Sequence, residues 1–133
     1  MICETCKERT NTIFISREHE KLCRGCHRMT LREKQSKFVK MVALLILYAY
    51  ERGYELTFGD AWSKPEYGAH CKNSNHYIRL AIDLNLFKNG KWLDKTVDHE
   101  FLGEFWEQLH PNNRWGGRFE DGNHYSFLHL GRS

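Results

Sequence analysis

The stretch SNHYIRLAIDLNLFKNGKW, residues 74–92, decides the fold that the sequence predicts. Ile78–Leu86 is mostly β-branched or aliphatic, which is typical of a strand. Asn89-Gly90 then stands between Phe87 and Trp92, and this dipeptide favours a two-residue hairpin turn. The stretch therefore predicts a strand that turns back on itself.

A helix is expected upstream of this stretch, beginning at Thr30. Thr30 can cap it, and Glu33 three residues later completes a capping box. Apolar residues then follow a helical face, and Gly53 is a plausible stop. The residues of that face are Phe38, Val39, Val42, Leu45 and Ile46.

The remaining elements complete a small domain. Tyr54–Phe58 alternates as a strand does, and residues 60–75, with Pro65 and Gly68, predict a loop. A second helical face precedes Pro111 and consists of Phe101, Leu102, Phe105, Trp106 and Leu109. A glycine-rich loop over 115–122 and a final strand over 124–130 follow. This order predicts an α+β domain with a small antiparallel sheet and flanking helices.

Composition sets limits on the class of protein. The chain has 133 residues, 41% of them hydrophobic, which is enough for one domain and a small appendage. Its most apolar stretch, Met41–Tyr50, is half the ~20 residues needed to cross a bilayer. The start, Met1-Ile2-Cys3-Glu4, does not resemble a signal peptide. We therefore expect a chain made in the cytoplasm without membrane insertion, which would need another route to any target outside.

Four cysteines form two CxxC pairs near the N-terminus. Sixteen residues separate the pairs, close to the spacing of structural Cys₄ zinc sites, and the ligands are Cys3, Cys6, Cys23 and Cys26. Such a site has no open position, so its zinc is structural. We assign residues 1–28 to this zinc knuckle and 29–133 to the main domain. Two alternatives exist for these cysteines: haem attached at the CxxCH motif of residues 23–27, and a framework of disulfide bonds. Both would require export of the chain, and the start of the sequence does not resemble a signal peptide.

Basic residues concentrate in the same region. Ten of the 20 Lys and Arg residues precede position 41, where five Glu residues oppose them. A basic arm of this kind fits nucleic acid or an anionic polymer such as cell wall, although a solvated face explains it equally well.

Two further segments carry groups that bind metals. Six residues separate His76 from Asp83, and a bend near Ile78 would aim both side chains at one point. Asp121 stands three residues before His124 in the glycine-rich region. Three imidazole and carboxylate ligands leave a fourth position for water, and a spare carboxylate can act as general base. A lone His or Asp is more often a polar residue with ordinary partners.

These residues resemble the zinc D-alanyl-D-alanine carboxypeptidase family, which includes the VanX- and VanY-like enzymes. The likeness is greatest to phage L-alanyl-D-glutamate endopeptidases used as endolysins, and it covers roughly Phe38 to the C-terminus. The family pattern S-x-H-x-x-G-x-A-x-D is matched at Ser74, His76, Ala81 and Asp83, with Arg79 in place of glycine. Its closing carboxylate and histidine are matched at Asp121 and His124.

The resemblance implies a Hedgehog/DD-peptidase-like fold and a catalytic Zn²⁺ held by His76, Asp83 and His124, with Asp121 as the base. It also implies bacterial peptidoglycan as substrate, a bacteriolytic role, and a partner that opens the membrane so that the enzyme reaches the wall.

Substrate recognition departs from the family pattern. Many relatives carry an arginine after the strand that we predict at Tyr54–Phe58, and Ser63 stands at that position here. Lys64 or Arg79 could supply the charge, and Ser74 and Trp115 are the other candidate substrate contacts.

Other functions stay open at this point. A D-Ala-D-Ala carboxypeptidase or dipeptidase would use the same metal site on a different bond. A non-catalytic protein that binds nucleic acid through the zinc knuckle is the alternative from another class, and a Cys₄ zinc nuclease has only His27 beside the knuckle to support it.

Overall fold

A computed structural model describes residues 29–64 and 73–133. The predicted knuckle ligands Cys3, Cys6, Cys23 and Cys26 lie outside these residues. The chain divides into two units, Met1–Lys34 and Gln35–Ser133. Everything below on the sheet and the site concerns the second unit.

The first described helix, α2 (Leu31–Glu51), begins as the sequence predicts. The Glu33 amide donates to Thr30 Oγ1 at 3.1 Å, and the Thr30 amide donates back to Glu33 Oε1 at 3.3 Å. The helix ends before Gly53, whose φ of +83° suits glycine. Its core face consists of Phe38, Met41, Val42, Leu45 and Ala49. Val39, which we expected on this face, is 65% exposed.

Five antiparallel strands form the sheet, in the order β1-β2-β5-β4 with β3 also paired to β2. They are β1 (Glu55–Phe58), β2 (Ala81–Lys88), β3 (Lys91–Leu93), β4 (Asn113–Trp115) and β5 (His124–Phe127). The β2–β3 hairpin turns at Asn89-Gly90, where φ is +52° and +77°. The predicted α+β class and this turn are confirmed.

Three features differ from the prediction. The residues before Ala81 form a short 3₁₀ helix, η3 (Asn75–Ile78), so β2 begins three residues later than expected. The stretch 115–122 is not simply a loop, because Trp115 closes β4 and a second 3₁₀ helix, η5 (Gly116–Phe119), follows. The last strand ends at Phe127 rather than at residue 130.

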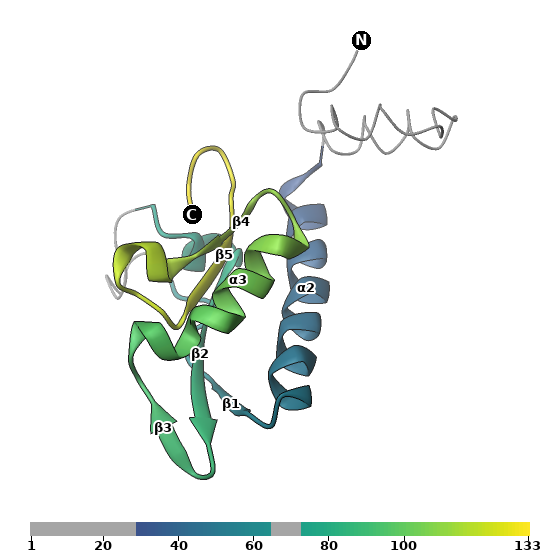
Figure 1. Ribbon diagram of the computed structural model, residues 1–133. Helices are drawn as coiled ribbons and strands as arrows, with labels where there is room; N and C mark the ends of the chain where they lie inside the picture. Colours follow the sequence, from purple (N-terminus) through teal and green to yellow (C-terminus); the bar gives the residue numbers. More distant parts are fainter. Residues whose placement is uncertain (1–28, 65–72) are drawn as a thin grey trace, which may run out of the picture. The chain divides into compact units, whose positions relative to one another are not determined.

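The helix α3 (Glu100–Leu109), preceded by the 3₁₀ helix η4 (Thr96–His99), packs with α2 on one face of the sheet (Figure 1). The core between them contains Leu84, Leu102, Trp106, Tyr125 and Phe127, all fully buried. Because strand side chains alternate, the residues between these point to the opposite face. Asp83 and His124 belong to that opposite face. Within 29–64 and 73–133, no helix is long and apolar enough to span a membrane.

Candidate metal centre

Three elements bring the predicted ligands together. His76 lies in η3, which Ser74 caps by accepting a hydrogen bond from the His76 amide at 3.2 Å. Asp83 of β2 and His124 of β5 are direct cross-strand partners. The strand register therefore places these two side chains next to each other, and η3 adds the third at the start of β2.

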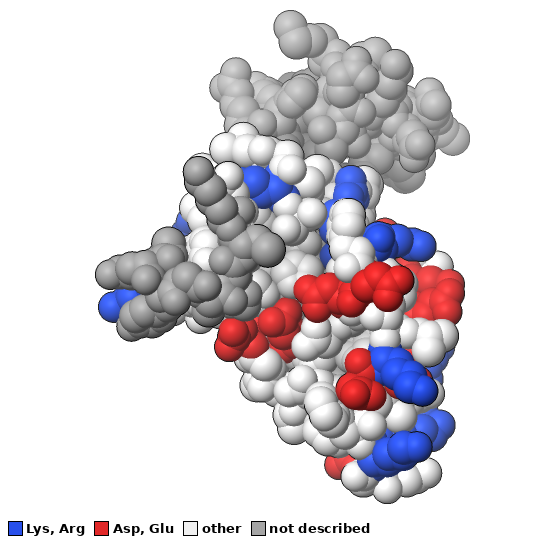
Figure 2. All heavy atoms as spheres, turned by 90° about the vertical axis from the view of Figure 1, so that its left-hand side faces the viewer, with Lys and Arg blue, Asp and Glu red and all other residues white. Residues whose placement is uncertain are grey.

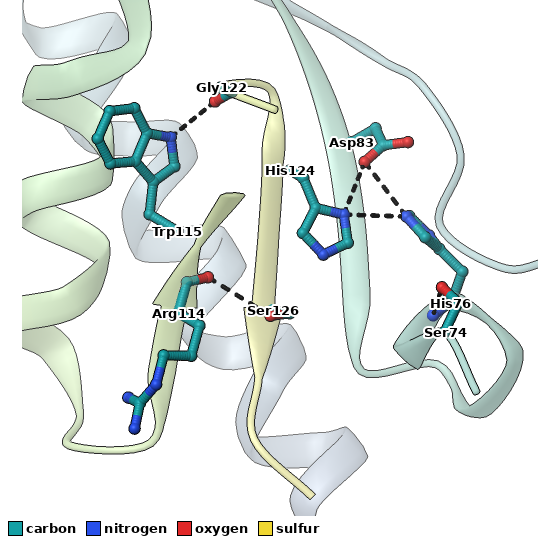
Figure 3. Close-up of polar contacts among 8 residues, drawn as sticks. All are labelled: Ser74, His76, Asp83, Arg114, Trp115, Gly122, His124 and Ser126. Carbon is teal, nitrogen blue, oxygen red and sulfur yellow. Dashed lines mark hydrogen bonds and ion pairs between the residues drawn. The ribbon is translucent and has the colours of Figure 1, made fainter. Parts of the chain in front are cut away.

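The three ligand atoms form a nearly regular triangle (Figure 3). His76 Nε2 and His124 Nδ1 each lie 3.2 Å from Asp83 Oδ1, and 3.2 Å from each other. The His76 residue is 1% exposed, while the Asp83 and His124 side chains keep 18% and 15% of their surface. The triangle is thus buried on one side and open on the other.

This geometry fits zinc. Ligands placed tetrahedrally at about 2.0–2.1 Å from Zn²⁺ lie about 3.3 Å apart, close to the observed edges. Two imidazole nitrogens and one carboxylate oxygen are donors that zinc accepts. In the described part of the chain, this is the group of His, Cys, Asp and Glu residues arranged to hold a metal ion. Three protein ligands leave the fourth position to water or substrate.

The electrostatics of the site also suit a cation. Burial raises the pKa of Asp83, but hydrogen bonds from His124 and His76 and their charges outweigh it and lower the pKa from 3.8 to about 2. The carboxylate is therefore ionised at any physiological pH. It offers a full negative charge to a metal ion.

Buried tryptophans fix the strand that carries His124. The Trp115 indole donates to the Gly122 carbonyl at 2.7 Å, and the Trp106 indole donates to the Ser126 carbonyl at 2.9 Å. These carbonyls stand two residues before and two residues after His124. Trp115, which we expected to line a substrate groove, lines the pocket but is 5% exposed, so it acts mainly as part of the wall.

A buried asparagine fixes the segment that carries His76. Asn75 is fully buried, and its Nδ2 donates to the carbonyls of Phe127 at 2.8 Å and Arg132 at 2.9 Å. Arg132 in turn donates to the carbonyls of Asn73 and Ser74. Hydrogen bonds therefore link residues 73–75, next to the ligand His76, to the C-terminal segment that contains Arg132. Sequence analysis missed Asn75, although its position between Ser74 and His76 was a signal.

Asp121 lines the same pocket as the ligands but does not belong to the ligand cluster. Its backbone is held, because its amide donates to the Gly116 carbonyl at 2.9 Å and its carbonyl accepts from the His124 amide at 3.1 Å. Asp121 is exposed to the pocket opening. Asp121 and the three ligands therefore share one pocket wall.

The other predicted substrate residues lie in different places. Ser74 lines the pocket, while Arg79 and Lys64 are not among its lining residues. The Arg79 guanidinium lies over the Trp62 ring, 4.4 Å from its centroid. Arg79 has φ +59°, a left-handed conformation that glycine adopts easily, which explains why glycine is usual at this position of the pattern.

Comparison with known proteins agrees with the geometry. A family model described as D-alanyl-D-alanine carboxypeptidase matches residues 67–127, a range that includes His76, Asp83, Asp121 and His124. No curated protein matches the chain significantly. The match and the His76-Asp83-His124 cluster together support a metal-dependent hydrolase of the peptidase class.

Proposed function

We propose that this chain is a zinc peptidase that cuts a stem peptide of bacterial peptidoglycan at the L-Ala-D-Glu bond, as phage endolysins do. The observation that carries the proposal is the triangle of ligand atoms with 3.2 Å edges, lying within the segment that the family model matches. A partner that opens the membrane would give the enzyme access to the wall.

The chain's own residues supply the remaining chemistry. His76, Asp83 and His124 would hold the ion, and when bound, zinc supplies Lewis acidity that polarises the scissile carbonyl and acidifies water. Asp121 accepts the proton of the attacking water and delivers it to the leaving amine, a role worth ~10²–10⁴ in rate. The pocket of about 290 Å³ around these groups receives the peptide.

The first experiment replaces the proposed base. Asp121→Asn should retain one zinc at the catalytic site and lose about 10²–10⁴-fold in turnover on purified peptidoglycan, because the carboxamide cannot accept a proton. Product masses and elemental zinc are measured together. Glu120→Gln is the matched control, since Glu120 is the exposed neighbour and does not line the pocket. Full activity of Asp121→Asn would refute the assigned base, and wild-type activity unaffected by a chelator would refute the metal mechanism.

A carboxypeptidase is the second candidate, and the description of the matching family favours it. The two reactions differ in their products. An endopeptidase frees the whole stem peptide after L-Ala, whereas a carboxypeptidase frees a single D-Ala. Mass spectrometry of the released fragments separates them.

Nucleic-acid binding through the N-terminal knuckle stays a prediction, because that segment lies outside the described residues. On the face shown in Figure 2, Asp and Glu side chains form a band, and Lys and Arg stand in separate groups. The described residues on that face do not form a continuous basic stripe of the kind that binds nucleic acid.

A further inference from the structure

The ligand His76 stands in an element too short to fix its own position. The 3₁₀ helix η3 covers four residues, Asn75–Ile78, and the hydrogen bonds of such a turn have poorer geometry than those of an α-helix. Its last residue is anchored from outside, because Gln35 of α2 donates to the Ile78 carbonyl at 2.8 Å. The start of η3, which carries His76, needs an anchor of its own.

Arg132 supplies that anchor from a turn much later in the chain. Its Nε donates to the Asn73 carbonyl at 2.7 Å, and its Nη2 donates to the Ser74 carbonyl at 3.1 Å. Two donors of one planar guanidinium thus bond to two consecutive residues. Ser74 is also the residue that caps η3 by accepting from the His76 amide. Figure 3 shows Ser74 and His76 on one turn, with the His76 ring directed to the other two ligands.

The backbone of Arg132 bonds to the same segment. Its carbonyl accepts from Nδ2 of the fully buried Asn75 at 2.9 Å. The turn is closed by two backbone hydrogen bonds of 2.9 Å between His129 and Arg132, and it passes through Gly131 at a φ of +77°, which suits glycine. Side chain and backbone of Arg132 therefore both hold the residues just before the ligand.

Arg132 can favour metal binding through geometry but not through its charge. It is not among the residues that line the pocket. A positive charge near a cation site weakens cation binding by Coulomb repulsion. If Arg132 strengthens zinc binding, it does so by fixing the position of a ligand.

We propose that Arg132 is a positioning residue for the metal site, which holds the backbone before His76 so that the imidazole meets Asp83 and His124 in ligand geometry. This proposal rests on the proposed function, because it takes His76 as a zinc ligand. A ligand that is fixed before the metal arrives loses less conformational freedom on binding, so Arg132 raises the affinity for zinc. By linkage, bound zinc stabilises the turn that contains Arg132 to the same extent.

The first test measures the zinc affinity of the full chain by competition with a chromogenic chelator. Arg132→Met should weaken zinc binding at this site about 10- to 100-fold, as is usual when a group that orients a metal ligand is lost. Coulomb energy alone predicts the opposite sign, because the variant removes a positive charge. His76→Ala supplies the background from metal bound elsewhere in the chain. Unchanged or tighter zinc binding in Arg132→Met would overturn the proposal.

Arg114→Met is the matched control. Nη1 of Arg114 also donates to two backbone carbonyls, those of Pro111 and Asn113, which lie three residues and one residue away in its own segment. Its replacement removes an arginine and two such bonds without touching the segment of His76, so zinc should bind no more weakly than in wild type. Equal weakening by Arg114→Met and Arg132→Met would overturn the specific role of Arg132.

A conservative replacement gives a second check. Arg132→Lys keeps the charge and a single donor group, so it should recover part of the affinity that Arg132→Met loses. An affinity as low as that of Arg132→Met would contradict a role that depends on bonds to the two carbonyls.

Hydrogen exchange on the wild-type chain tests the reciprocal effect and needs no variant. Zinc should slow the exchange of the His129 and Arg132 amides, which close the turn, relative to the chelator-treated protein. The Arg52 amide, which donates to the Ala49 carbonyl at the end of α2, is the reference and should not change. Equal exchange of the turn amides with and without zinc would refute the linkage.

The outcomes distinguish this proposal from the one on which it rests. Weaker zinc binding in Arg132→Met, together with no cleavage of peptidoglycan by wild type, would support the positioning role and overturn the proposed reaction. Zinc-dependent cleavage, with a zinc affinity that does not depend on Arg132, would leave the peptidase intact and overturn the positioning role. Equal zinc content in wild type and His76→Ala would overturn both.

Discussion

At the scale of single residues, Asp83 organises the site through one oxygen atom. Oδ1 of Asp83 accepts from both histidine ligands at 3.2 Å, and both backbone hydrogen bonds of Asp83 go to the segment that follows β1. Its amide donates to the Asp60 carbonyl, its carbonyl accepts from the Gly59 amide, and the next amide donates to Asn123. The ligand with the full negative charge therefore also has its backbone fixed by hydrogen bonds.

A second histidine system lies beneath the site and makes folding sensitive to pH. His99 is 2% exposed, and its Nδ1 lies 2.9 Å from the hydroxyl of Tyr125, the neighbour of His124. Burial lowers the pKa of His99 below 6.5, against smaller upward effects of the Leu93 backbone and Asp98. The unfolded chain thus binds a proton more readily than the folded one, and stability falls as pH drops below the unfolded value.

The prediction concerns how steeply the stability of the protein depends on pH. Between about pH 7.5 and about pH 5, wild type should lose stability to urea more steeply than His99→Gln, whose side chain does not titrate. Denaturation midpoints measured across this range test it. Parallel curves for the two proteins would show that His99 is protonated equally in the folded and unfolded states.

At the scale of elements, the turn between η5 and β5 is tight because of Gly116. A Cβ on this residue would lie 2.7 Å from the Cβ of His124 and closer still to the Asp121 carbonyl oxygen. The closeness lets η5, Asp121 and His124 form one compact unit. Any side chain at 116 must move the ligand or the proposed base.

Gly116→Ala should therefore weaken zinc binding at the catalytic site, with a loss of about 1–3 kcal/mol in stability from overpacking. Zinc affinity is measured by competition with a chromogenic chelator. Gly53→Ala is the control, because it strains a backbone at φ +83° with nothing within 4 Å of the new Cβ. If both variants lose stability and zinc affinity in parallel, the effect of Gly116 is general rather than local.

At the scale of the whole molecule, the core and the site belong to the unit Gln35–Ser133. We predict that a chain of residues 30–133, which keeps the Thr30 cap, folds and binds one zinc. The full chain should bind two, the second at Cys3, Cys6, Cys23 and Cys26. His76→Ala in the full chain should leave one.

Elemental analysis of the three proteins after removal of loosely bound metal checks these numbers. One zinc in the wild-type full chain would refute the two-site prediction. Loss of thermal cooperativity in the shorter chain would show that the N-terminal unit is needed for folding.

The sequence by itself determined the local elements and the ligand types. The Thr30-Glu33 cap and the Asn89-Gly90 turn involve residues at most three positions apart, so both can be predicted from the local sequence. The positions of His76, Asp83, Asp121 and His124 could also be predicted, because the spacing matches a known pattern. The boundaries of β2, η5 and β5 could not, because sheet pairing rather than propensity ends these strands.

Only the tertiary structure decided how those residues meet. The contacts of His124 with Asp83 and His76 join positions 41 and 48 residues apart, and they depend on the register of β2 against β5. The same register places Arg114 on the face of the sheet that carries the metal ligands, and no local sequence pattern predicts this. A slip of one residue would turn Asp83 toward the core, so the site exists only because long-range pairing, set by burial of alternate side chains, fixes which face each residue occupies.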